Sequence, residues 1–190
     1  MRYGLKWHEY AHQWDNMLIN HGRQAEFQRL AKFAVDHKAR YKAIEAKTGV
    51  PWYLIAALHR RESDADFSTY LGNGDPLNRP TRHVPRGRGP FKSFEDGAVD
   101  ALKLDGLSNV KDWRLEKVLF YAELFNGAGY SDYHHVPSPY IWGGSNQQSR
   151  GKYTSDGHWD PNAWDSQPGV APMLQAMMDL DPSIQPIRET

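Results

Sequence analysis

The chain has 190 residues, of which 39% are hydrophobic and 24% charged, and its 23 basic and 23 acidic residues give a formal net charge of zero. This composition is typical of a globular protein, and the length suits a single domain, residues 1–190, with its own core. A neutral chain is a poor match for nucleic acid, because nucleic-acid binders neutralise phosphates with an excess of Lys and Arg. No run of about 18 apolar residues occurs, so we expect no stable membrane insertion.

The absence of cysteine excludes disulfides, thiolate metal sites and cysteine nucleophiles. The first ten residues contain no apolar h-region, so we expect synthesis in the cytoplasm without a Sec-type signal peptide. Nine histidines invite a metal interpretation, but His59 and Glu62 form His-x-x-Glu rather than His-Glu-x-x-His, and the neighbours His134 and His135 cannot easily bind one tetrahedral ion. We therefore expect no metal and no other cofactor.

Apolar residues that recur every three or four positions predict helices in these ranges of the chain: 5–20, 24–47, 51–63, 94–105, 113–125 and 169–180. Two stretches between them, residues 64–92 and 131–168, are rich in Gly, Pro and polar residues and are expected to be loops. Loops of this length inside a compact domain are usually functional. We expect a mainly α fold with two long loops and a small β element near residues 68–90.

The helix predicted at 51–63 ends in a carboxylate. The residues that share its apolar face are Trp52, Ile55, Leu58, His59 and Glu62. A carboxylate on such a face is expensive unless it is paired or used, and an apolar environment would raise its pKa. Thirteen residues later an exposed glycine-rich turn, residues 72–76, presents Asp75, which should stay ionised. Two carboxyl groups in unlike surroundings favour glycosidic bond cleavage.

The pair Glu62-Ser63, followed by Gly74-Asp75, closely resembles goose-type lysozymes and lytic transglycosylases. In those enzymes a Glu-Ser pair ends a buried helix and a Gly-Asp turn follows at similar spacing. Asp75 and Thr81 are separated by five residues, as in phage-type lysozymes, where such a pair holds the attacking water. The phage-type spacing from Glu to Asp is not met, because Leu71 lies nine residues beyond Glu62.

Further motifs, in the same order and at similar spacing, extend the resemblance to phage and bacterial lysozyme-like proteins over roughly residues 50–175: Asn73–Leu77, Phe125–Tyr130 and Ser138–Trp142. The Gly-Leu-Met-Gln segment of goose-type enzymes is missing, and residues 89–92 occupy the comparable region. The resemblance implies an α+β lysozyme-like fold, with Glu62 as general acid and with Asp75 and Thr81 at the attacking water. It also implies sugar binding by Asn126, Tyr130, Tyr140 and Trp142.

The implied activity is that of a peptidoglycan muramidase, such as the endolysin of a phage or prophage. Such a protein is expected to be a monomer that acts on the bacterial cell wall in the periplasm after release. A lytic transglycosylase is the closest alternative, in which the sugar's own 6-hydroxyl attacks and Asp75 matters little. Chitinase or chitosanase activity is a further alternative. From another class, the chain could be a non-catalytic wall-binding or phage structural protein on a lysozyme scaffold.

Residues 79–92 form a basic segment without a single acid. Its basic residues are Arg79, Arg82, Arg86, Arg88 and Lys92. The simplest interpretation is a solvated loop, and the alternatives are contact with peptidoglycan carboxylates or with anionic lipid headgroups.

Overall fold

The computed structural model describes residues 3–155 and 157–189, and these are mainly helical, as predicted. The chain divides into two compact units, which we call the first unit (Met1–Lys32 with Arg114–Thr190) and the second unit (Phe33–Trp113). The single-domain assignment for residues 1–190 stays a prediction. None of the helices built from the described residues is long and apolar enough to cross a membrane.

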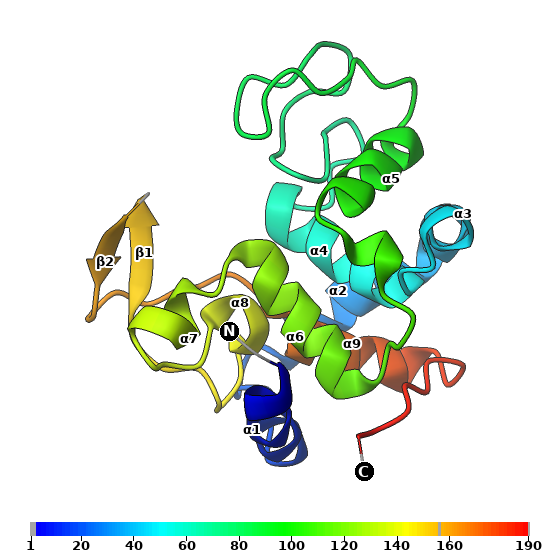
Figure 1. The fold of residues 1–190 in the computed structure, drawn as a ribbon. Helices are drawn as coiled ribbons and strands as arrows, with labels where there is room; N and C mark the ends of the chain where they lie inside the picture. Colours follow the sequence, from blue (N-terminus) through cyan, green and yellow to red (C-terminus); the bar gives the residue numbers. More distant parts are fainter. Residues whose placement is uncertain (1–2, 156, 190) are drawn as a thin grey trace. The chain divides into compact units, whose positions relative to one another are not determined.

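The second unit is built around three helices and a short 3-10 turn: α3 (Lys38–Thr48), α4 (Trp52–Ser63), α5 (Phe94–Leu104) and η1 (Leu107–Asn109). Helix α3 packs against both α4 and α5. Side chains from all three helices make the core, including Tyr41, Ile44, Leu58, Phe94 and Leu102, each at most 1% exposed. Between α4 and α5 the chain runs through a long irregular loop (Figure 1).

The first unit contains α1 (Tyr3–Asp15), α6 (Leu115–Asn126), α7 (Gly129–Tyr133), α8 (Pro139–Trp142), β1 (Lys152–Ser155), β2 (His158–Asp160) and α9 (Val170–Leu180). Helix α6 contacts α1, α8 and α9, so it forms the centre of this unit. Gly143 and Gly169 let two backbone segments touch, because a Cβ at Gly169 would lie 2.4 Å from the Gly143 nitrogen. The strands β1 and β2 pair as an antiparallel hairpin.

The helix predicted at 24–47 is wrong at its middle. The chain instead forms α2 (Gln24–Asp36) and α3, separated at His37, which has φ −101° and ψ 11°. The ring Nδ1 of His37 donates to the Phe33 carbonyl at 2.8 Å, and the His37 backbone N–H donates to the same oxygen at 3.1 Å. The Phe33 carbonyl therefore has two hydrogen-bond partners on His37, at the residue where α2 and α3 separate.

Helix α1 also ends earlier than the predicted residue 20, because the chain beyond it pairs elsewhere. Leu18 and Asn146 exchange hydrogen bonds of 2.8 and 3.0 Å, and Ile19 forms an isolated β-bridge with Ser145. The small β element predicted near residues 68–90 lies elsewhere in the chain. That stretch contains only the isolated bridge between Thr69 and Pro76, and the paired strands lie at β1 and β2.

Candidate functional site

Helix α4 brings Glu62 from a buried face to the surface. Trp52, Ile55, Leu58 and His59 are each at most 2% exposed, whereas Glu62, one turn further on, is half-buried. The predicted apolar face is therefore confirmed up to the last turn of the helix. Glu62 thus lies where the buried face of the helix meets the surface.

The chain reverses sharply after Glu62. Asp64 and Ala65 have φ angles of 57° and 58°, although neither is a glycine. The Asp64 N–H donates to the Arg60 carbonyl at 3.2 Å, and the Ala65 N–H donates to the His59 carbonyl at 3.1 Å. Left-handed conformations cost roughly 1–2 kcal/mol for each such residue, and strain of this kind is common where a site must be held in place. The reversal fixes the direction in which the loop leaves Glu62.

A glycine-rich turn packs against this end of α4. Gly74 has φ 72°, and a Cβ added to it would lie 3.5 Å from the Glu62 backbone oxygen. The turn is closed by two hydrogen bonds, from the Tyr70 N–H to the Asp75 carbonyl at 2.7 Å and from the Gly74 N–H to the Tyr70 carbonyl at 2.8 Å. Glu62 and Asp75 thus belong to backbone segments that lie side by side in the second unit.

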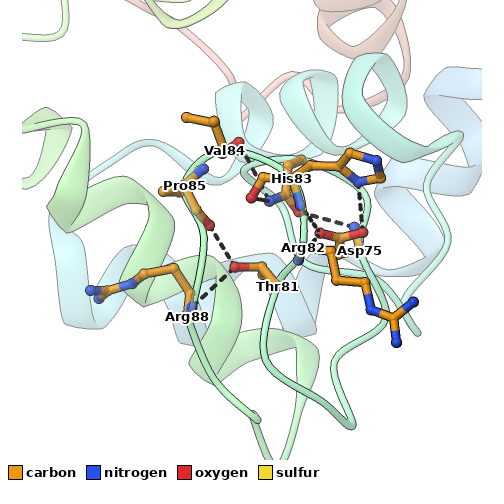
Figure 2. Close-up of polar contacts among 8 residues, drawn as sticks. Asp75, Thr81, Arg82, His83, Val84, Pro85 and Arg88 are labelled. Carbon is orange, nitrogen blue, oxygen red and sulfur yellow. Dashed lines mark hydrogen bonds and ion pairs between the residues drawn. The ribbon is translucent and has the colours of Figure 1, made fainter.

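The Asp75 carboxylate is buried, at 8% exposure, so the expectation of an exposed carboxylate is wrong. Its Oδ2 accepts hydrogen bonds from the backbone N–H groups of Arg82 and His83 at 2.8 and 2.9 Å, and its Oδ1 accepts one from His83 Nδ1 at 2.8 Å (Figure 2). The His83 and Arg82 N–H groups and the His83 ring outweigh the opposing effect of burial and hold the pKa of Asp75 below its usual value. Asp75 is therefore an ionised anchor for the loop that follows it.

Thr81 is the second anchor of this loop. Its hydroxyl donates to the Pro85 carbonyl at 2.5 Å and accepts from the Arg88 N–H at 3.0 Å (Figure 2). The side chain is only 5% exposed. Its single proton is already donated within the protein, so in this structure Thr81 has no hydrogen-bond donor left for an attacking water. The structure thus gives Thr81 a role in shaping the loop, and its catalytic role has no geometric support.

The loop is also tied to α5. Asp100 on α5 accepts hydrogen bonds of 2.9 Å from the Tyr70 hydroxyl and from Arg88 Nε. Tyr70 in turn stacks on Phe91, with ring centroids 5.2 Å apart and planes inclined by 4°. The paired Arg88 guanidinium lowers the pKa of Asp100, which keeps that carboxylate charged.

His59, one turn before Glu62, is a fully buried histidine. Its Nδ1 lies 3.0 Å from the Tyr41 hydroxyl, and its ring packs on Phe94 with centroids 4.1 Å apart. Nε2 has no hydrogen-bond partner among the described residues. Burial lowers the pKa of His59 to about 4, so the ring is neutral at physiological pH. It belongs to the core and is not a ligand of the site.

The four predicted sugar-binding residues all lie in the first unit. Tyr140 and Trp142 are 2% and 1% exposed, so their rings present no face to a sugar in this structure, and their sugar-binding role stays a prediction. Tyr130 is 7% exposed, and its hydroxyl accepts from the Tyr153 N–H at 3.3 Å. Asn126, the last residue of α6, is exposed and stays a candidate for hydrogen bonding to a polar ligand.

Two features of the first unit escaped the sequence analysis. One is an aromatic cluster on the β1–β2 hairpin, where His134 stacks on Trp159 at 3.7 Å and its Nε2 lies 2.9 Å from the Tyr153 hydroxyl. The alternation of aromatic and polar residues on either side of Gly157 was the available signal. These three side chains are half-buried and pack against one another.

The other is Glu123 on α6, which is 2% exposed. Burial raises the pKa of Glu123, against the opposing effect of hydrogen bonds from Ser131 and from Tyr10, whose hydroxyl lies 2.6 Å away. A raised pKa suits a general acid, but a carboxyl so completely enclosed cannot reach a polymer. We therefore assign it a structural role.

In the part of the chain that the structure describes, no group of three or more His, Asp or Glu side chains is placed to hold a metal ion. Comparisons of the chain with protein-family models, with curated proteins and with solved structures find no match.

Proposed function

We propose that the protein is a peptidoglycan muramidase that cleaves the β-1,4 bond between N-acetylmuramic acid and N-acetylglucosamine, with Glu62 as its general acid. One observation carries this proposal. The half-buried Glu62 ends the buried face of helix α4, and the turn that packs on the same helix end bears an ionised carboxylate, Asp75. Carboxyl groups in unlike environments can divide the acid and the anionic roles of glycoside cleavage.

In this mechanism Glu62 protonates the oxygen of the leaving sugar. The oxocarbenium-like transition state carries positive charge, which a fixed anion such as Asp75 stabilises. The hydrogen bonds from the Arg82 and His83 N–H groups fix the position of the Asp75 carboxylate. Because this carboxylate is ionised, it has no proton to donate and cannot be the general acid.

The test is the variant Glu62→Gln, which keeps the shape of the side chain and removes its proton. General acid catalysis is typically worth about 10²–10⁴-fold, so turnover of purified peptidoglycan should fall by that factor while the circular dichroism spectrum is unchanged. Glu45→Gln is the matched control, because Glu45 is a half-buried glutamate of the same unit that pairs with Lys42 at the surface. Near-wild-type turnover by Glu62→Gln would contradict the assignment.

A lytic transglycosylase is the second candidate, and one observation favours it. Asp75 and Thr81, the residues that would hold an attacking water, are both engaged in hydrogen bonds within the loop. A reaction in which the sugar's 6-hydroxyl attacks needs no such water. Mass spectrometry of the digestion products separates the two: reducing-end muropeptides support hydrolysis, and 1,6-anhydro muropeptides support the transglycosylase.

A further inference from the structure

A loop with unpaired cations follows the turn that packs against the Glu62 backbone. We use the name basic loop for residues 79–92, all of which the structure describes. Arg88 is paired with Asp100, whereas the remaining cations are exposed and form no ion pair with any described residue: Arg79, Arg82, Arg86 and Lys92. The carboxylate of Asp75 is turned inward onto the loop backbone, and that of Asp100 is taken up by Arg88. The exposed charged side chains of the basic loop are therefore all cationic.

The basic loop is preformed. Asp75 holds the backbone at Arg82 and His83, and Asn73 Nδ2 donates to the His83 carbonyl at 3.2 Å. Thr81 and Arg88 close the loop through a backbone hydrogen bond of 2.9 Å. In Figure 2 the side chains of Arg82 and Arg88 extend to opposite sides of this network. A ligand that binds the unpaired cations of the basic loop does not have to order the backbone first, which lowers the entropic cost of binding.

We propose that the basic loop binds the carboxylates of peptidoglycan stem peptides. The inference rests on the proposed function in taking peptidoglycan as the polymer. The loop is anchored through Asp75 to the turn that touches the Glu62 backbone, so a glycan strand held at Glu62 would carry its stems past it. The planar guanidinium fork matches a carboxylate with two parallel hydrogen bonds.

The same surface fits a membrane less well. Loops that enter lipid interfaces usually carry Trp, Phe or Leu, and the one large apolar side chain strongly exposed on the basic loop is Val84, at 79%. Phe91 is half-buried against Tyr70. The chain as a whole is neutral, which weakens long-range attraction to an extended polyanion.

Binding is measured by co-sedimentation with peptidoglycan sacculi, in the Glu62→Gln background so that the polymer stays intact. The loop variant is Arg79→Gln/Arg82→Gln/Arg86→Gln. The matched control, Arg29→Gln/Lys103→Gln/Lys111→Gln, removes three other exposed cations. Measurements are made at about 10 mM ionic strength, where the Debye length is about 30 Å. Exposed ion pairs are individually weak, so the loop variant should bind about tenfold more weakly than the control.

Sacculi whose stem carboxylates have been amidated provide the second arm. The affinity of the Glu62→Gln protein with an unchanged loop should fall on them by about the same factor, and the loop variant should no longer differ from the control. Equal binding of the loop and control variants to native sacculi would overturn the inference, as would binding of the Glu62→Gln protein that amidation leaves unchanged. Loop-dependent binding to phosphatidylglycerol vesicles without loop-dependent binding to sacculi would replace it with a membrane surface.

Failure of the proposed function gives a different pattern. If the wild-type protein releases no muropeptides but binds native sacculi through the basic loop, the loop inference stands and the muramidase proposal falls. If the wild-type protein releases muropeptides and the loop variant binds sacculi like the control, the proposed function stands and the loop inference falls.

Discussion

Acidification should destabilise the second unit through His59. The ring is fully buried, so a proton on it would be a buried charge whose cost outweighs the opposing effect of the nearby Asp66. Burial lowers its pKa from 6.5 to about 4. The unfolded chain therefore binds a proton at His59 in a pH range where the folded chain does not.

The sign and size of the effect follow from linkage. Stability from His59 is fully present above pH 6.5 and is lost as the pH falls from there towards about 4, where the folded ring also becomes protonated. At about 1.4 kcal/mol for each pKa unit, the shift corresponds to a loss of about 3 kcal/mol in the free energy of unfolding.

Urea unfolding at a series of pH values between 7 and 4 measures this loss. Carboxyl groups also titrate in that range, so the informative quantity is the difference between the wild type and His59→Gln. The variant should be less stable than the wild type at pH 7 but should lose about 3 kcal/mol less on acidification. His21→Gln, which changes an exposed histidine, should follow the wild type. The reasoning is refuted if His59→Gln and the wild type lose stability in parallel.

Two further substitutions test roles that the structure assigns. Thr81→Val keeps the shape of the side chain and removes one hydrogen bond to Pro85 and one from Arg88, so it should lower the free energy of unfolding by about 1–3 kcal/mol in urea titrations. An unchanged midpoint would remove Thr81 as a loop anchor. Trp142→Ala should cost about 3–5 kcal/mol by the same assay, because the ring is 1% exposed, and a loss of sugar affinity at unchanged stability would instead restore its predicted ligand role.

Secondary structure is predicted best from the sequence where it follows from a local pattern of apolar residues. Helix α4 was expected at 51–63 and spans Trp52–Ser63, because a dense apolar run after a proline leaves few alternatives. The sequence does not predict the break at His37, where a single residue leaves the helical backbone conformation with φ −101° and ψ 11°. The hydrophobic periodicity continues across His37 and therefore does not indicate the break.

The candidate site was predictable in its residues and less so in their surroundings. Asp75 was expected on an exposed turn because Asn-Gly-Asp-Pro is a turn sequence, but its burial depends on N–H groups seven and eight residues away. Tyr140 and Trp142 were placed at the sugar site by their motif, and composition cannot distinguish a stacking ring from a core ring. Non-local contacts decide both cases, and a single sequence does not contain them.

Asp75 has two roles, as an anion in the proposed reaction and as an anchor of the basic loop, and a single substitution of Asp75 cannot separate them. Asp75→Asn removes a charge, but it also replaces an acceptor by an NH₂ group that faces the N–H donors of Arg82 and His83. Loss of turnover in this variant would therefore follow either from the missing anion or from a disordered loop.

His83→Ala separates these explanations. It removes only the ring contact to Asp75 Oδ1, leaves both backbone hydrogen bonds, and changes a side chain that is 76% exposed. If the charge is what matters, His83→Ala should keep most of its turnover while Asp75→Asn loses it, and hydrogen exchange of the Arg82 and His83 amides should accelerate only in Asp75→Asn. If both variants lose turnover together with amide protection, loop order is the cause. If Asp75→Asn turns over peptidoglycan normally despite a loosened loop, neither the anion nor the loop order is needed for the reaction, and the transglycosylase mechanism gains support.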